Sequence, residues 1–138
     1  MRPRSVFLML LLLTGCGSGT LSGQQQQLAL ARFRWEAQNL RSYRFTIRRS
    51  GFISPEAQGP VVITVRKGVA ETAPESFEAY NTVEKLFGLL EAAYQSHADT
   101  VTVQYEAVRG LPTSLFIDQS LQIADEEYGL SVTDFTPL

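Results

Sequence analysis

The sequence has little of the chemistry that most enzymes use: one cysteine, Cys16, and one histidine, His97, in 138 residues. One cysteine cannot form a disulfide within the chain, and a zinc site needs several ligands at regular spacing. A Ser-His pair needs a histidine base, but His97 lies just past an expected helix, where a cap or solvated position is its ordinary role. No serine lies in the G-x-S-x-G pattern of a nucleophile elbow. We therefore expect no metal site and no cofactor. The net charge is −2, and we expect no nucleic-acid partner.

Long hydrophobic runs are also scarce. The main one, Val6 to Leu13, follows Arg2 and Arg4 and is far shorter than the roughly 18–20 apolar residues of a membrane-spanning helix. A short positive head before such a run is typical of a secretory signal. Leu13-Thr14-Gly15-Cys16 resembles the lipobox of bacterial lipoproteins. This resemblance implies cleavage before Cys16, which then carries lipid on its sulfur and on its new amino terminus.

Three segments follow from this interpretation. We expect a signal peptide at residues 1–15, the lipidated Cys16 with a flexible tether at 16–27, and a single domain at 28–138. The tether is rich in glycine, serine and glutamine, which suits a flexible coil. By resemblance to Gram-negative lipoprotein sorting, glycine instead of aspartate at position 17 favours the outer membrane. We expect an exported, membrane-anchored lipoprotein on the periplasmic side there, or on the outer cell surface in a cell with one membrane.

Apolar periodicity predicts an α+β fold. Spacings of three and four predict a helix over about 25–40, with two apolar stripes that we expect to be buried, and a second helix capped by Asn81 with Glu84 three residues later. Residues 73–80, directly before the second helix, are predicted to be a loop. Alternation predicts strands near 43–48, 61–65, 69–72, 101–105, 115–117 and 128–132, joined by short links that make them antiparallel. We predict two main helices packed on one face of a mainly antiparallel sheet of five to six strands.

Charge is distributed unevenly along the chain. Residues 32–67 contain eight basic side chains and two acidic ones, whereas residues 68–138 contain two basic and twelve acidic ones. A basic part of this kind could face an anionic surface such as lipid headgroups or a cell-wall polymer. Alternatively, basic and acidic strands lie side by side and pair within the fold.

Two groups of residues are candidates for binding. Arg44 and Arg48 share the polar face of one predicted strand and form a short basic row that phosphate or carboxylate could use, although an ordinary exposed strand face explains them equally well. The second group is acidic and could bind calcium or support acid-base chemistry. The spacing lacks the D-x-D-x-D-G pattern of a calcium loop, so a solvated loop is the alternative. This group contains Glu106, Asp118, Asp125, Glu126 and Glu127.

The order of several short motifs is similar to that of a family of uncharacterised bacterial secreted proteins and lipoproteins. The similarity covers about Leu30 to Phe135, and it implies an envelope location and no established activity. Many relatives have cysteines where this chain has Gly51 and Ile53, so cysteine chemistry at that loop is not expected here. The motifs are Trp35, Tyr43-Arg44-Phe45, Arg48 to Ile53, Asn81 to Phe87, Val103 to Glu106, Gly110-Leu111-Pro112, Ile117-Asp118 and Asp125 to Tyr128.

These features favour a lipoprotein anchored through Cys16 that acts by binding in the cell envelope and is not an enzyme. Its expected partners are the membrane, through the anchor, and another envelope protein or a cell-wall polymer. One alternative is a carboxylate-based envelope hydrolase, which requires two carboxyl groups to converge in a pocket. The other is a phospholipid- or polymer-binding module, which requires the arginines to gather on an open face without acidic partners from the C-terminal strands.

Overall fold

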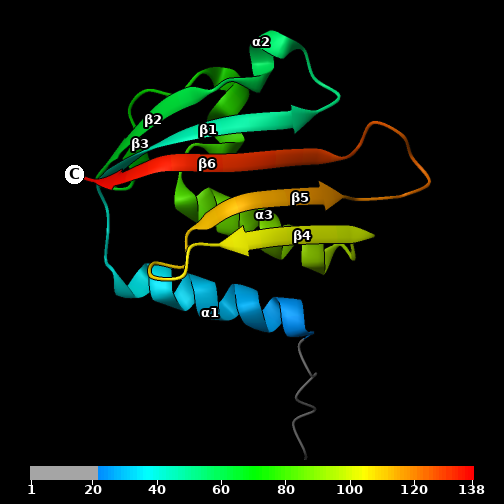
Figure 1. Cartoon of the computed structure of the whole chain (residues 1–138), viewed down its shortest axis with the longest axis horizontal. Helices are drawn as coiled ribbons and strands as arrows, with labels where there is room; N and C mark the ends of the chain where they lie inside the picture. The colour runs from blue at the N-terminus through cyan, green and yellow to red at the C-terminus, as the bar shows by residue number, and fades with distance from the viewer. Residues whose placement is uncertain (1–21) are drawn as a thin grey trace, which may run out of the picture.

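The computed structural model describes residues 22–138, and Cys16 and the signal segment lie outside that range. Figure 1 shows a twisted sheet with its main helices below and behind it. The elements in chain order are α1 (Gly23–Ala37), β1 (Tyr43–Gly51), α2 (Pro55–Gln58), β2 (Val61–Arg66), β3 (Val69–Ala70), η1 (Glu75–Tyr80), α3 (Val83–Gln95), β4 (Thr100–Tyr105), β5 (Pro112–Asp118) and β6 (Tyr128–Pro137).

The sheet has six strands in the order β3-β2-β1-β6-β5-β4, and every neighbouring pair is antiparallel. The last strand, β6, lies between β1 and β5 and therefore joins the N-terminal and C-terminal hairpins into one sheet. The predicted α+β class and the mainly antiparallel sheet are confirmed.

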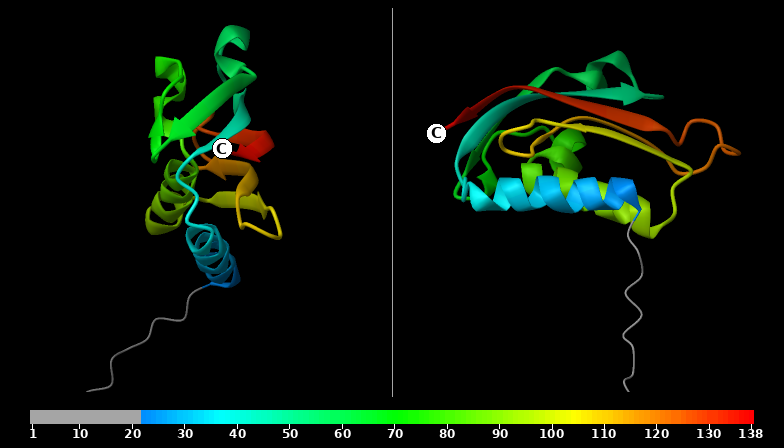
Figure 2. Two further views of the ribbon diagram at one scale, coloured as in Figure 1. Left: turned by 90° about the vertical axis from the view of Figure 1, so that its left-hand side faces the viewer. Right: turned by 60° about the horizontal axis from the view of Figure 1, so that its bottom comes forward.

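The inner face of the sheet holds the core, and α3 lies across it (Figure 2). Tyr43, Phe45 and Ile47 on β1 are fully buried, as the alternation in the sequence predicts. The apolar stripe of α3 covers these three side chains. Burial of such a stripe holds a helix on a sheet. Its buried residues are Val83, Leu86, Phe87, Leu90 and Ala93.

Helix α1 buries only one of its two apolar stripes. Leu28, Ala31 and Trp35 are buried, but the side chains of Leu30 and Phe33 are 57% and 71% exposed. The expectation of two buried stripes is wrong because α1 lies at the β4 edge of the structure, where only one side of the helix meets protein (Figures 1 and 2). From this position it also shields the edge strand, since Gln24 Nε2 donates to the carbonyl of Val101 on β4 (3.3 Å).

Two local details differ from the sequence predictions. The N-cap of α3 is Thr82 and not Asn81, because the Thr82 hydroxyl accepts the hydrogen bond from the Lys85 N–H (3.2 Å). Residues 75–80 form the short helix η1 where a loop was expected. Phe77 is fully buried in the core and fixes this segment to the sheet.

A bulge in β6 changes which way its last residues point. Thr133 pairs with Thr46 and Thr136 pairs with Arg44, so two residues, Asp134 and Phe135, lie opposite a single residue of β1. Asp134 takes up the extra residue at a left-handed φ of 54°. Phe135 then points inward and packs against the rings of Trp35 (5.6 Å between centroids) and Tyr43 (5.5 Å).

Candidate functional site

The outer face of the sheet is not covered by α1 or α3, which both lie on the opposite side (Figure 2). We call this surface the open face. It carries the outward residues of β1, among them Arg44 and Arg48, which alternate with the buried residues of the same strand and are exposed. At about 3.3 Å per residue, the two positions lie roughly 13 Å apart along β1.

Neither Arg44 nor Arg48 has an acidic partner within the part of the chain that the structure describes. Within residues 22–138, the four ion pairs are Arg32–Glu36, Arg32–Glu91, Arg66–Glu71 and Arg109–Glu106. Arg44 lies opposite Thr64 and Thr136, and Arg48 lies opposite Ser131. Pairing between strands of opposite charge therefore does not account for these two side chains.

A shallow hollow of about 200 Å³ lies beside Arg48 on the open face. Hydroxyl side chains surround it because Arg48, Ser131 and Ser114 are consecutive partners across β1, β6 and β5. Gly129 forms part of its floor, where an added Cβ would lie 2.4 Å from the Ser50 hydroxyl. A guanidinium beside several hydroxyls can hold an anionic group and hydrogen-bond to a polar ligand. The exposed ring of Phe116 adds an apolar contact at the same hollow.

The structure does not bring the acidic candidates together. Asp118 pairs with Thr100 at one end of β4, whereas Glu106 follows the other end of that strand, roughly 20 Å away at strand spacing. The Glu106 carboxylate accepts from the N–H groups of Val108 (3.2 Å) and Arg109 (2.6 Å) and so closes the β4–β5 turn. Glu106 and Asp118 therefore lie far apart and do not form one carboxylate site.

The remaining acidic candidates have turn or solvent positions. Asp118 Oδ1 accepts from the Ser120 N–H (3.1 Å), which is the hydrogen bond of a local turn. Asp125 and Glu126 are exposed in the β5–β6 loop, and Asp125 has a φ of 73°. Across the described residues no three His, Cys, Asp or Glu side chains lie close enough to hold a metal ion.

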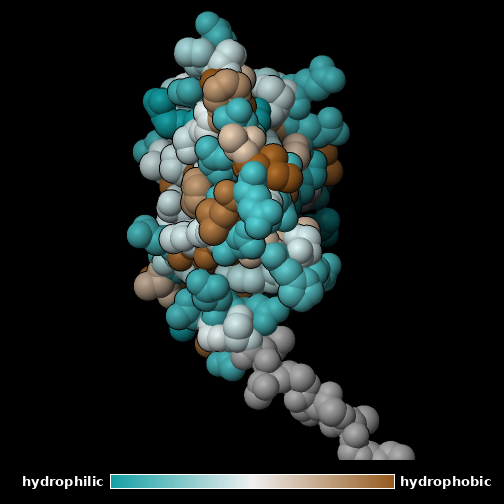
Figure 3. Space-filling model, turned by 90° about the vertical axis from the view of Figure 1, so that its right-hand side faces the viewer, coloured by the Kyte–Doolittle hydropathy of each residue, from teal (hydrophilic) through white to brown (hydrophobic). Residues whose placement is uncertain are grey.

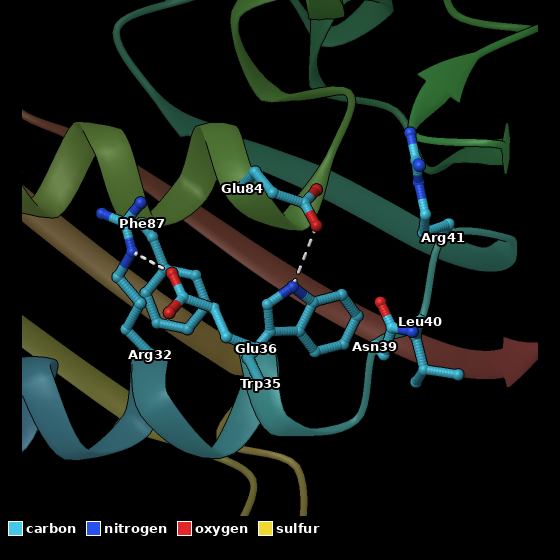
Figure 4. Close-up of a pocket in the computed structure, with 8 residues that line it drawn as sticks. All are labelled: Arg32, Trp35, Glu36, Asn39, Leu40, Arg41, Glu84 and Phe87. Atoms are coloured by element: carbon cyan, nitrogen blue, oxygen red, sulfur yellow. Dashed lines mark hydrogen bonds and ion pairs between the residues drawn. The ribbon is translucent and has the colours of Figure 1, made fainter.

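A second hollow of about 200 Å³ lies where α1, the loop that follows it and α3 meet (Figure 4). The Glu84 carboxylate at its wall accepts from Trp35 Nε1 (3.0 Å) and from the Tyr43 hydroxyl (2.9 Å). The Tyr43 oxygen in turn accepts from the Val83 N–H (3.0 Å). Burial, together with the neighbouring Glu84 carboxylate, raises the pKa of Tyr43 far above its ordinary value.

This network links three elements and has a structural role. Both carboxylate oxygens of Glu84 are bonded to buried donors, so they satisfy polar groups that would otherwise be unpaired in the core. Sequence reasoning placed Glu84 only in a capping box. A buried tryptophan and a buried tyrosine each need a hydrogen-bond acceptor. This requirement is the feature of the sequence that indicates a nearby carboxylate.

One comparison with known proteins identifies a family. Residues 27–137 match the model described as Family of unknown function (DUF6174), and the chain belongs to this family. No curated protein and no solved structure gives a significant match. In the part of the chain that the structure describes, no helix has the length and apolar character needed to cross a membrane.

Proposed function

We propose that this DUF6174 family member is an exported lipoprotein, anchored through Cys16, whose open face binds a ligand in the cell envelope. The observation that carries the proposal is the exposed pair Arg44 and Arg48. Both lie on a sheet face that neither main helix covers, and neither has an acidic partner among residues 22–138. The signal-like segment and the lipobox resemblance support the anchor.

The chemistry of the open face favours an anionic, hydroxyl-bearing ligand such as a cell-wall polymer. Guanidinium groups bind phosphate or carboxylate with charge-assisted hydrogen bonds, and the serine and threonine rows supply further donors and acceptors. A polymer can contact both arginines at once across their roughly 13 Å separation. Glu106 and Asp118 lie at opposite ends of the β4–β5 hairpin, so these two carboxylates do not converge as the carboxylate-hydrolase alternative requires.

The anchor is tested by Cys16→Ser. We expect this variant to lose incorporation of labelled palmitate and to leave the membrane fraction, because no other cysteine can carry the lipid. The measurement is metabolic labelling followed by fractionation of the envelope, with the unmodified chain as control. Palmitate incorporation that persists in the variant would refute anchoring at Cys16.

The ligand is tested by Arg44→Gln combined with Arg48→Gln. Each lost charge-assisted hydrogen bond contributes about 1.5–3 kcal/mol, so we expect binding to purified anionic cell-wall polymer to weaken at least about tenfold. Arg34→Gln combined with Arg41→Gln is the matched control, since it removes the same charge away from the open face. Co-sedimentation with the polymer measures both variants, and circular dichroism checks that they fold. Equal binding by the two double variants would exclude the open face as the site.

A further inference from the structure

We propose that the outward side of α1 lies on the membrane surface and holds the domain upright on it. We call this side of the helix, formed by Ala29, Leu30, Phe33 and Ala37, the apolar stripe of α1. All four residues are exposed, and their spacing places them on one side of a helix, opposite the buried Leu28, Ala31 and Trp35. This inference rests on the proposed anchoring at Cys16.

The stripe is similar to the apolar side of a helix that lies in a membrane interface. It contains two large apolar side chains and no charged residue, although α1 also carries Arg32, Arg34 and Glu36 at other positions. Such helices insert their apolar side at the boundary between headgroups and acyl chains.

The position of α1 in the chain favours lipid over another occupant. Gly23, its first residue, follows Cys16 by seven positions, and a chain of that length reaches at most about 25 Å. A lipid on Cys16 therefore keeps the stripe near the bilayer.

Another exposed apolar group fits a lipid surface less well. Phe52, Leu121 and Ile123 are exposed in loops at one end of the sheet, and Figure 3 shows apolar side chains scattered among hydrophilic ones at this end. The acidic run 125–127 lies in the same loop as Leu121 and Ile123. Anionic headgroups would repel these carboxylates, whereas the stripe of α1 has no acid within it.

This orientation also says what the open face can reach. In Figure 1 the strands follow one another away from α1 in the order β4, β5, β6, β1. With strands about 4.8 Å apart, β1 lies roughly 14 Å farther from the membrane than β4. Arg44 and Arg48 would then stand clear of the headgroups with the open face turned sideways, so their ligand is a polymer of the envelope and not phospholipid.

The experiment uses the lipidated full chain in liposomes that contain a lipid-linked quencher. Because Cys16 is blocked by lipid, a single new cysteine can be labelled with an environment-sensitive fluorophore. We expect Phe33→Cys to give a blue-shifted probe that lipid quenches several-fold more than the probe at Val62→Cys. Val62 is a matched control because it is 56% exposed, apolar, and located on β2 far from α1.

Two further measurements separate the possible failures. Palmitate labelling of the same samples tests the anchor: without it the proposed function and this inference both fall. With lipid present, a probe at position 33 that stays in water overturns only the inference. A blue shift that needs high protein concentration and no lipid would assign the stripe to a second copy of the chain and would also overturn the inference.

A second variant tests the stripe itself. Adding Leu30→Ser to the Phe33→Cys chain should reduce lipid quenching at least twofold while palmitate labelling persists, and unchanged quenching would count against the stripe.

Discussion

Gly110→Ala is expected to lower the free energy of unfolding by about 3 kcal/mol, which combines a left-handed backbone penalty with overpacking. Gly110 has a φ of 77°, and a Cβ there would lie 2.1 Å from the carbonyl oxygen of Ala31 on α1. The obstacle is backbone, which cannot rotate away. The turn itself is fixed, because the Gly110 N–H donates to the Glu106 carbonyl (2.9 Å) and the Glu106 N–H donates to the Leu111 carbonyl (2.8 Å). The new methyl group must therefore push α1 away from the sheet.

The measurement is urea unfolding followed by the fluorescence of Trp35, the only tryptophan of the chain and a buried residue of α1. Gly88→Ala is the matched control, since a Cβ at this exposed position of α3 meets nothing within 4 Å. We expect it to raise stability by about 0.5–1 kcal/mol, the helix preference of alanine over glycine. A Gly110→Ala protein as stable as the unmodified chain would contradict the close contact between the turn and α1.

Much of the fold could be predicted from periodicity, and the errors have specific causes. The alternation of β1 and the single stripe of α3 each have one apolar side, so the side that faces the core follows directly. Helix α1 has two apolar stripes, and periodicity alone cannot say that one of them stays exposed. Phe135 lies beyond the predicted strand near 128–132, and its inward direction depends on the bulge at Asp134, which requires the partner strand to be known.

The candidate site was predicted in part. Arg44 and Arg48 share a side of β1 by simple alternation, and the structure places both on the open face. Ser114 and Ser131 were missed because they meet Arg48 only when β6 lies between β1 and β5, an order that strand patterns do not contain. The same limit applies to Glu106 and Asp118, since the separation of two residues on a hairpin depends on register.

A steep loss of stability above about pH 10 is the other large effect that we expect, and its source is buried tyrosine. Burial, together with the Glu84 carboxylate, raises the pKa of Tyr43, and burial and the nearby Tyr94 ring raise the pKa of Tyr105. In the unfolded chain these phenols release their protons near pH 10, whereas in the folded chain they keep them. The unfolded state then binds fewer protons, so stability is fully present below about pH 10 and falls as the pH rises further. Trp35 fluorescence and tyrosinate absorbance, recorded together, should change in one cooperative transition.

Two phenylalanine variants separate this ionisation from hydrogen bonding. The Tyr43 hydroxyl joins Glu84 and Val83, so Tyr43→Phe should cost about 1–2 kcal/mol at neutral pH and yet make the alkaline fall shallower. The Tyr105 hydroxyl is buried and has no hydrogen-bond partner among residues 22–138. Tyr105→Phe should therefore be neutral or stabilising at pH 7, while it also makes the alkaline fall shallower. Equal stability of the unmodified chain at pH 8 and at pH 11 would contradict this prediction. It would mean that folding does not change the proton affinity of the buried phenols.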